Sequence, residues 1–558
     1  MACRIDDAVS CAPPDAVIDA LRQQIIGKDE VITTPFGLRP LVYADYTASG
    51  RALTSIEDTI RQEVLPTYAN THSELSFTGH RTGALREWAR DFIKKMVNAR
   101  TDDALIFCGS GSTSAINTLV HLLGISAHQE DTCGSSATQR PVVFIGPYEH
   151  HSNDLPWRES LAEVVRIPLS ERGTIDLAFL KDALVRFVNR PLLIGSFSAA
   201  SNVTGVKTDV EAITQLLHRY GAMACWDYAA AAPYLPIDLN ADSAQLDAVA
   251  FSPHKFLGGP GSSGILLIKQ KWIRHPAPFQ IGGGTVDYVT PDWHEWHADP
   301  ELRLEGGTPG IIESIRAALA MSVTQSMGYS KIHALEDNHA QRVLTQLARF
   351  PGIELLGSTD LPRLPIFSLR VHSDAGELHH GYVVRLLNDL FGIQARGGCS
   401  CAGPYGHALL NIAPAHSKAL AHEIKNGFGC LKPGWVRFNT HWICSAEEAD
   451  YMVQALGLIA QWGSRLLPSY QMTLSGDWRH RDAGPSGAID LRLPPLVGAA
   501  ASTKTEPAID LNDLLAHAET TLKLGAPERH RDLTRAEKTE WPASAESLCW
   551  FLRPHEAC

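Results

Sequence analysis

Short apolar runs alternate with helix-like stretches through the middle of the chain, and this alternation constrains the fold more than any other feature. The runs are continuously apolar, which is typical of strands that are buried on both faces and joined by helical crossovers. Six runs show it, at 104–107, 141–145, 192–197, 222–226, 248–251 and 265–268. The pattern predicts an α/β domain with a mainly parallel sheet, in which ligands bind at the carboxyl ends of the strands.

The pattern of elements changes after about residue 335. Residues 336–464 show fewer and shorter units, which is typical of a smaller α+β domain. Its expected elements are strands at 365–371 and 435–439 and helices at 381–390 and 446–462. A chain of 558 residues is long enough for two or more domains of this kind.

The last part of the chain, residues 465–558, is expected to form an extension of unknown role. Residues 493–507 resemble a linker in composition, and 509–524 fit one amphipathic helix. We expect four units in all: an N-terminal segment (1–40) that packs with the small domain, a large domain (41–335), the small α+β domain (336–464) and this C-terminal extension.

Charge, hydropathy and cysteine usage exclude several classes of protein. The formal net charge of -12 disfavours binding to nucleic acid or to an anionic membrane. No run approaches the length of a membrane span, and the start of the chain lacks the basic end and apolar stretch of a signal peptide. We therefore expect a cytoplasmic protein that acts on small molecules. Its eleven cysteines should be mostly reduced, and one or two of them reactive.

Lys255 lies on a turn between the apolar runs at 248–251 and 265–268. The turn, 252–261, is rich in small residues that leave it open to a ligand, and a lysine placed there can form a Schiff base with an aldehyde. The alternative is an ordinary solvated loop lysine, because glycine-rich turns are common. Companion residues elsewhere in the chain favour the first interpretation.

Three other segments offer groups that pyridoxal 5′-phosphate needs. Residues 108–117 follow an apolar run and open a helix pattern, where small residues let backbone N–H groups approach a phosphate. Asp227 ends the run at 222–226, where a carboxylate can hold a proton on the pyridine nitrogen. His150 follows the run at 141–145 and can cover the ring. The ordinary alternatives are helix capping, a turn aspartate and a surface histidine.

Seven motifs in order resemble the class V aminotransferase family, and within it most closely the cysteine desulfurase and selenocysteine lyase group. They are Gly111–Thr113, Glu149–Asn153, Ser201–Gly205, Asp227, Ser252–Lys255, Gly282–Gly284 and Glu305–Pro309. The resemblance covers roughly residues 41–462, and the ordered combination is more specific than any single motif. It implies a fold-type I transferase with a seven-stranded type of sheet, bound pyridoxal 5′-phosphate and a homodimer with active sites at the subunit boundary.

The resemblance also implies roles for individual residues. It gives Lys255 the Schiff base, Asp227 the pyridine nitrogen, and His150 ring stacking and proton transfer. The implied phosphate-binding positions are Ser112, Thr113, Ser252 and His254, together with Thr308, which reaches the phosphate of the neighbouring subunit. One departure is Ala230, which stands where desulfurases usually have a glutamine near the cofactor, so the tuning of the ring is open.

The implied substrate-binding residues are Asn202, Arg396 and Arg437. Arg437 matches the arginine that clamps the substrate carboxylate in this family. The chemistry suits arginine, because its planar fork makes two charge-assisted hydrogen bonds to a carboxylate.

The segment 394–404 bears on the type of reaction, because it contains two cysteines. Cys401 aligns with the cysteine that receives sulfur in the desulfurases, and Cys399 replaces a residue that is commonly histidine. The nearby Arg396 and the glycine-rich backbone would favour an exposed thiolate. The alternatives are a buried structural pair and a metal site formed with His407, which is one ligand short. We expect no metal.

These observations predict an enzyme that removes sulfur or selenium from L-cysteine or selenocysteine, giving L-alanine and a persulfide on Cys401. Its expected partners are a small amino acid, a second copy of the chain and a sulfur-acceptor protein. A further hypothesis is that the persulfide passes to Cys399, or that the two cysteines close into a sulfur-bridged pair. One alternative is a class V aminotransferase, epimerase or carbon–sulfur lyase in which Cys401 has no sulfur role. Another is a scaffold without catalysis, against which the whole Lys255 set argues.

Overall fold

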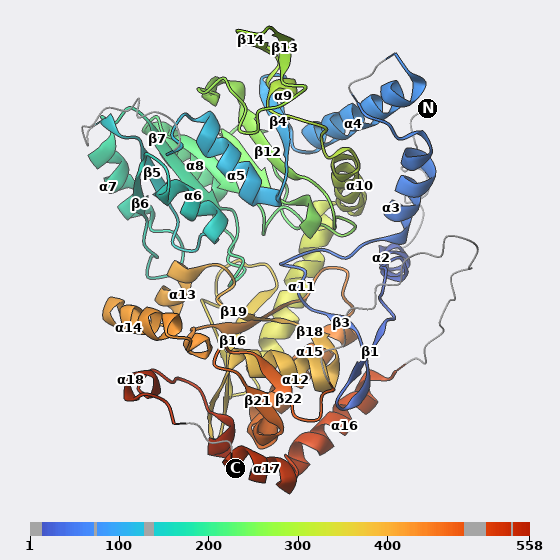
Figure 1. Ribbon diagram of the computed structural model, residues 1–558, viewed down its shortest axis with the longest axis vertical. Helices are drawn as coiled ribbons and strands as arrows, with labels where there is room; N and C mark the ends of the chain where they lie inside the picture. The colour runs from blue at the N-terminus through green and yellow to red at the C-terminus, as the bar shows by residue number, and fades with distance from the viewer. Residues whose placement is uncertain (1–13, 72–74, 128–138, 485–508, 537–539, 558) are drawn as a thin grey trace.

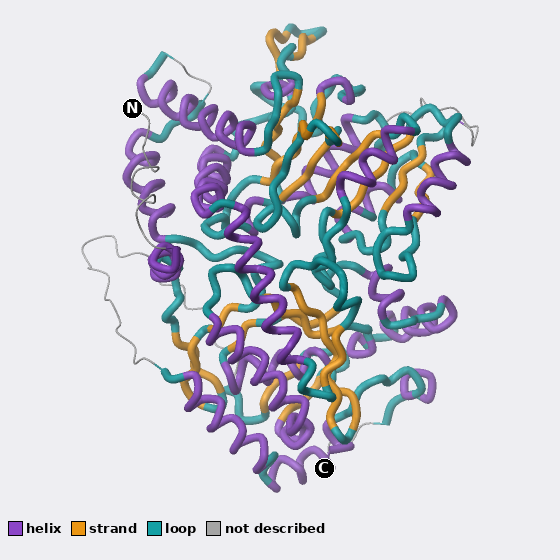
Figure 2. Tube along the Cα trace, turned by 180° about the vertical axis from the view of Figure 1, so that it is seen from behind, coloured by secondary structure: helices purple, strands orange, loops and turns teal. Residues whose placement is uncertain are grey.

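The computed structural model describes residues 14–71, 75–127, 139–484, 509–536 and 540–557. These residues form two lobes, each built around its own sheet (Figure 1). The long helix α11 (Tyr329–Leu347) runs from one lobe into the other (Figure 1, Figure 2).

A seven-stranded sheet forms the core of the large lobe. Its order is β4 (Asp103–Cys108), β12 (Gly264–Lys269), β11 (Ala248–Phe251), β8 (Met223–Asp227), β7 (Leu193–Ser198), β5 (Val142–Ile145) and β6 (Glu163–Arg166). Neighbouring strands are parallel except that β12 runs antiparallel to both β11 and β4. The predicted α/β fold with a mainly parallel sheet is confirmed. The sequence pattern missed only β6, which lies half-buried at the sheet edge and therefore lacks a continuous apolar run.

Helices surround this sheet and connect its strands. The main ones are α4 (Phe77–Met96), α5 (Gly111–Leu122), α7 (Leu177–Phe187), α8 (Val210–Arg219) and α10 (Ile311–Met327). A hairpin of β13 (Val286–Val289) and β14 (His294–Trp296) projects from the top of the lobe (Figure 1).

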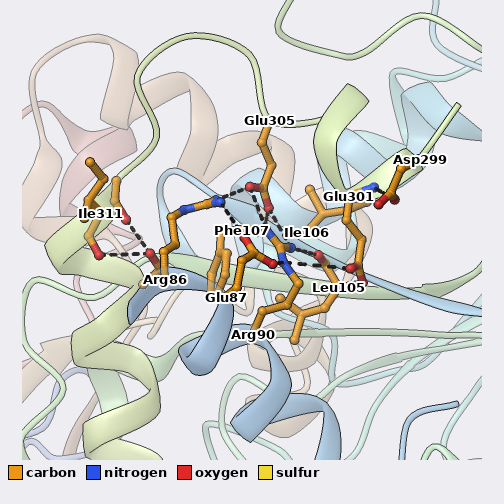
Figure 3. Close-up of polar contacts among 12 residues, drawn as sticks. Arg86, Glu87, Arg90, Leu105, Ile106, Phe107, Asp299, Glu301, Glu305 and Ile311 are labelled. Atoms are coloured by element: carbon orange, nitrogen blue, oxygen red, sulfur yellow. Dashed lines mark hydrogen bonds and ion pairs between the residues drawn. The ribbon is translucent and has the colours of Figure 1, made fainter. Parts of the chain in front are cut away.

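The outer edge of β4 is closed by two glutamates (Figure 3). Glu301 accepts a hydrogen bond from the backbone N–H of Leu105, and Glu305 accepts one from that of Phe107, both at 2.7 Å. Glu305 is in turn paired with Arg90 of α4 at 3.1 Å. Carboxylates thus occupy donors that an open strand edge would offer to another chain. They also fix the start of the Glu305–Pro309 motif.

The small lobe contains a five-stranded sheet. Its order is β15 (Ile353–Leu355), β16 (Ile366–Ser373), β20 (Trp435–Asn439) and β19 (Arg396–Gly398), with β17 (Gly376–Leu378) paired to β16. Helices α12 (His380–Phe391), α14 (Pro414–Lys425) and α15 (Ala446–Trp462) complete the lobe. The structure therefore contains the strands and helices that the sequence predicted here, with ends that differ by a few residues.

The N-terminal residues contact both lobes. Helix α2 (Pro14–Gln23) precedes a hairpin of β1 (Val31–Thr34) and β2 (Gly37–Pro40). Strand β3 (Val42–Tyr43) pairs in parallel with β18 (Ile393–Gln394) of the small lobe. Farther along, Gly50 donates its N–H to the carbonyl of His254 at 2.9 Å, which brings the segment against the Lys255 turn.

The C-terminal extension packs on the small lobe. Its elements are β21 (Tyr470–Met472), β22 (Trp478–His480), α16 (Leu511–Leu524), α17 (Glu528–Ala536) and α18 (Ala543–Glu546). Helix α16 corresponds to the predicted amphipathic helix, whereas the predicted linker at 493–507 lies outside the described residues. Trp550 stacks on His379 and His380, with ring centroids 5.3 and 5.8 Å apart. Within the described ranges, no helix is long and apolar enough to cross a membrane.

Candidate active site

Lys255 ends a short 3-10 turn (Pro253–Lys255) between β11 and β12 of the large sheet. The turn is tight, because a Cβ atom on Gly259 would lie 1.9 Å from the carbonyl oxygen of Pro253. Burial lowers the pKa of Lys255 from 10.5 to about 8, although the carboxylate of Asp227 opposes that shift. A lysine with this pKa is partly uncharged near neutral pH, which suits a nucleophile and a base.

Asp227 ends β8, the strand next to β11, so it lies at the same edge of the sheet as Lys255. One carboxylate oxygen accepts hydrogen bonds from the N–H of Ala229 at 2.8 Å and from Ser112 Oγ at 2.9 Å. Burial raises the pKa of Asp227, and these two hydrogen bonds and Lys255 work against the rise. The result is a buried carboxyl group at the end of β8, where it could form a hydrogen bond with a ring nitrogen.

The start of helix α5 forms an anion-binding surface beside this pair. The N–H of Ser112 points to Ser252 Oγ at 2.8 Å. Gly111 has φ +57°, and a Cβ atom there would lie 2.6 Å from Ser252 Oγ, so a side chain would close the approach. Thr113 Oγ1 lies 2.6 Å from Ser152 Oγ. The N–H groups and hydroxyls gathered at this helix N-terminus suit a phosphate.

His150 and His254 flank the same region. His150 Nδ1 accepts the N–H of Ser152 at 3.1 Å, which leaves the ring proton on Nε2. Burial, followed by the charge of Lys255, lowers the pKa of His150 to about 3. A pKa this low makes His150 a neutral ring near neutral pH. His254 lies on the Lys255 turn, with Nδ1 3.4 Å from Ser49 Oγ.

Two arginines lie next to each other on adjacent strands of the small-lobe sheet. Arg396 of β19 is the register partner of Arg437 of β20. Both contact the carboxylate of Asp45, Arg437 Nη2 at 2.7 Å and Arg396 Nε at 3.0 Å. Arg437 Nη1 also donates to the carbonyl of Asn202 at 3.2 Å, and its buried Nε has no partner among the described residues. Sequence reasoning found the arginines and Asn202 but missed Asp45. A lone aspartate after a two-residue strand carries no signal, and its partners lie more than 350 residues away.

The cysteine loop connects β19 to α13 (Gly403–Leu409), and both Cys399 and Cys401 are exposed. This exposure contradicts the alternative of a buried structural pair. Ser400 and Cys401 have φ +52° and +55°, and the N–H of Ala402 closes the turn onto the carbonyl of Cys399 at 3.1 Å. Left-handed backbone costs L-residues about 1–2 kcal/mol each, and such strain collects at functional sites.

The large lobe holds this strained loop by its backbone. Asn202 Nδ2 donates to the carbonyl of Ser400 at 2.8 Å, and the N–H of His151 donates to the carbonyl of Cys401 at 2.7 Å. From the small lobe, Trp435 Nε1 donates to Ser400 Oγ at 3.2 Å. The loop therefore lies where the two lobes meet, beside the predicted substrate residues.

Two of the predicted residues, Thr308 and His407, form their hydrogen bonds with residues outside this cluster. Thr308 accepts a hydrogen bond from Asn70 Nδ2 at 3.2 Å, in the segment that precedes α4. His407 uses both ring nitrogens in hydrogen bonds, to the carbonyl of Gly403 at 2.8 Å and to Ser417 Oγ at 2.9 Å. The described residues contain no group of three or more His, Cys, Asp or Glu side chains arranged to hold a metal ion.

Comparison with known proteins agrees with this geometry. Residues 42–426, more than half of the chain, match the family model of class-V aminotransferases. The chain belongs to the class-V aminotransferase family. The match ends at residue 426, before β20, α15 and the C-terminal extension.

Curated relatives within the class-V family are desulfurases. A probable cysteine desulfurase from Streptomyces coelicolor is 28% identical over 407 residues, which span 70% of this chain and 93% of the relative. A cysteine desulfurase from Escherichia coli is 28% identical over 422 residues, which span 75% of this chain and 93% of the relative. The family recognised from the sequence motifs is therefore confirmed.

Solved structures support the fold. The apo cysteine desulfurase from Thermococcus onnurineus superposes with a TM-score of 0.64 at 22% identity, covering 79% of this chain and 98% of the other. The desulfurase CsdA from Escherichia coli gives a TM-score of 0.61 at 21% identity, covering 80% and 98%. At this identity the likeness establishes the shared architecture.

Proposed function

We propose that this class-V enzyme is a pyridoxal phosphate-dependent cysteine desulfurase, which converts L-cysteine to L-alanine and leaves a persulfide on Cys401. The observation that carries the proposal is the exposed thiol of Cys401 on a strained loop, held by Asn202 and His151 at the boundary of the two lobes. A family member acting only as an aminotransferase has no use for such a thiol. Selenocysteine, which has the same shape, is a second candidate substrate.

The residues around Lys255 fit pyridoxal 5′-phosphate. Lys255 offers an amine that is partly uncharged near neutral pH, Asp227 a buried carboxyl, and His150 a neutral ring. The glycine-lined start of α5, with Ser112 and Ser252, offers donors for the phosphate. When bound at such a site, the cofactor withdraws electrons from the α-carbon of an amino acid.

The chain's own groups then bind the substrate and move its protons. Arg437 is proposed to hold the α-carboxylate through its free Nε, with Arg396 beside it. Lys255 removes the α-proton, because its lowered pKa leaves a neutral amine available. His150 carries its proton on Nε2 and serves as a hydrogen-bond donor rather than as a cation.

Cys401 is proposed to carry out the sulfur transfer. Its thiolate attacks the sulfur atom of the substrate, so that a sulfur–sulfur bond forms and the carbon–sulfur bond breaks. The electron pair of the broken bond stays with the carbon fragment, which gains a proton and leaves as alanine. The persulfide then lies on an exposed loop, where an acceptor protein can reach it.

A homodimer is proposed on the basis of exposed apolar side chains. Leu75, Phe77, Tyr288 and Trp293 are all more than half exposed, at the start of α4 and on or beside the β13–β14 hairpin. Exposed apolar patches mark interaction sites in soluble proteins. In such a dimer Thr308, which lies outside the Lys255 cluster, would serve the neighbouring subunit's phosphate. We place the enzyme in the cytoplasm, where its thiols stay reduced.

The test supplies L-cysteine to the purified holoprotein and measures alanine and sulfide. Wild type is compared with Cys401→Ala and with Cys549→Ala, a half-buried cysteine of the extension that serves as the matched control. Alanine formation lost only in Cys401→Ala supports desulfuration. Turnover retained in Cys401→Ala would instead select a class-V reaction without a sulfur-accepting thiol.

A further inference from the structure

The two arginines of the carboxylate clamp already share a carboxylate, that of Asp45. Its two oxygens contact different arginines, Oδ1 with Arg437 at 2.7 Å and Oδ2 with Arg396 at 3.0 Å. Arg437 is 3% exposed, so its charge has lost nearly all of its water. A buried guanidinium without a counter-charge is unfavourable, and Asp45 supplies that charge while no substrate is bound.

The clamp is nevertheless incompletely neutralised. Arg437 Nε is buried and has no partner among the described residues, and only the Nε atom of Arg396 is bound to Asp45. Two arginine charges and one carboxylate leave the group with a net charge of +1. The group therefore retains charge and one unused donor for a further carboxylate, and a simple amino acid brings one α-carboxylate.

The electrostatic influence of this group extends to Lys255. Arg437 and Arg396 lower the pKa of Lys255, and Asp45 raises it. The charges of the group therefore act on the Lys255 amine. Asp45 is also held in place by the backbone, since the segment after β3 is fixed to the small lobe by the Asn439 side chain.

We propose that Asp45 is an internal counter-charge that limits how tightly the site binds the α-carboxylate of its amino-acid substrate and product. Because substrate and alanine carry the same α-carboxylate, tighter binding at this point would act on both equally. Such uniform binding lowers KM without accelerating the chemical step, and it slows product release. Asp45 is thus a residue that sets affinity for the reaction proposed above, on which this inference rests for the identity of the carboxylate.

The experiment titrates holoprotein with L-alanine and with L-alanine methyl ester, and follows the visible absorption of the cofactor. The ester has the same amine and side chain but no carboxylate charge. We expect Asp45→Asn to bind L-alanine about tenfold more tightly, with the ester affected less than about twofold. Asp29→Asn, on an exposed aspartate of the N-terminal segment, should change neither affinity.

Arg396→Gln provides an independent variant, since this side chain is 48% exposed and its loss should not prevent folding. It leaves Asp45 opposite Arg437 alone, so L-alanine binding should weaken about tenfold. The double variant Asp45→Asn/Arg396→Gln restores the net charge of +1 and should return affinity toward that of wild type. In turnover, Asp45→Asn should lower KM for L-cysteine without raising kcat.

Three outcomes would overturn the inference: weaker or unchanged L-alanine binding in Asp45→Asn, an equal change with the ester, or a double variant that binds L-alanine no more tightly than Arg396→Gln does. The first and second would make Asp45 a structural anchor of the arginines. Alanine titration needs no desulfuration, so failure of the sulfur chemistry leaves this test intact.

Discussion

The Lys255 turn and the cysteine loop serve one proposed reaction but are built in opposite ways. Lys255 and Asp227 lie at the ends of buried neighbouring strands, on backbone that tight glycine packing constrains. Cys401 lies on an exposed loop with two left-handed residues, held by a few hydrogen bonds from both lobes. Electron withdrawal requires a fixed arrangement, whereas a thiol that takes sulfur from a substrate and gives it to an acceptor requires access from outside.

The largest effect should come from removing the Lys255 side chain, in the buried part of the site. Lys255→Ala removes both the attachment point and the base, so alanine formation should fall by about a thousandfold or more. Amino-acid analysis of the product measures this, and borohydride reduction with peptide mapping should place the cofactor on Lys255 in the wild type. Lys418→Ala, on an exposed lysine of α14, is the control. A Lys255→Ala protein with near-normal turnover would contradict the assignment.

The pH dependence of cofactor uptake tests the lowered pKa of Lys255. Because the pKa of Lys255 is lowered from 10.5 to about 8, its amine is protonated below that pH and reactive above it. The rate at which apoprotein takes up pyridoxal 5′-phosphate should therefore rise up to about tenfold between pH 7 and 9. Stopped-flow absorbance measures the rate. Asp227→Asn should move the midpoint lower, since Asp227 raises the pKa of Lys255, and a wild-type midpoint near 10.5 would refute the environment described.

A smaller effect should come from weakening a hydrogen bond that holds the exposed cysteine loop. Trp435→Phe removes the indole N–H that donates to Ser400 Oγ. Loss of one hydrogen bond should speed alkylation of Cys401 by iodoacetamide and slow alanine formation, each by about threefold. Mass spectrometry of the alkylated peptide follows the first. Trp462→Phe is the matched control, because its buried Nε1 has no partner among the described residues. Equal behaviour of the two variants would mean that the bond does not hold the loop.

The smallest effect concerns the backbone strain itself. Ser400→Gly should raise the free energy of unfolding relative to Ser400→Ala by about 1 kcal/mol, because glycine adopts φ +52° without the Cβ clash. Both variants lose the Ser400 hydroxyl, so their difference isolates the backbone conformation. Denaturant titration gives the comparison. If the alanine variant proves equally stable, the turn is not strained.

The sequence predicted the fold well, because continuous apolar runs report burial directly. It predicted six of the seven strands, and missed β6 because an edge strand can be half polar. The sequence did not predict features that depend on contacts between residues far apart in the chain. The neutral state of His150 arises from burial and from Lys255, and the role of Asp45 arises from two arginines late in the chain. The left-handed Ser400 carries no signature in its residue type.

Strand β3 has a consequence for the order in which the protein assembles. It pairs with β18, and the nearby buried Arg39 binds the carbonyl of Leu390, which lies 351 residues later. A growing chain emerges from the ribosome at about 5–20 residues per second, so these N-terminal residues wait many seconds for their partners. During that interval the large lobe can fold while β3 remains unpaired. Such long-range pairing slows folding and exposes apolar surface to aggregation.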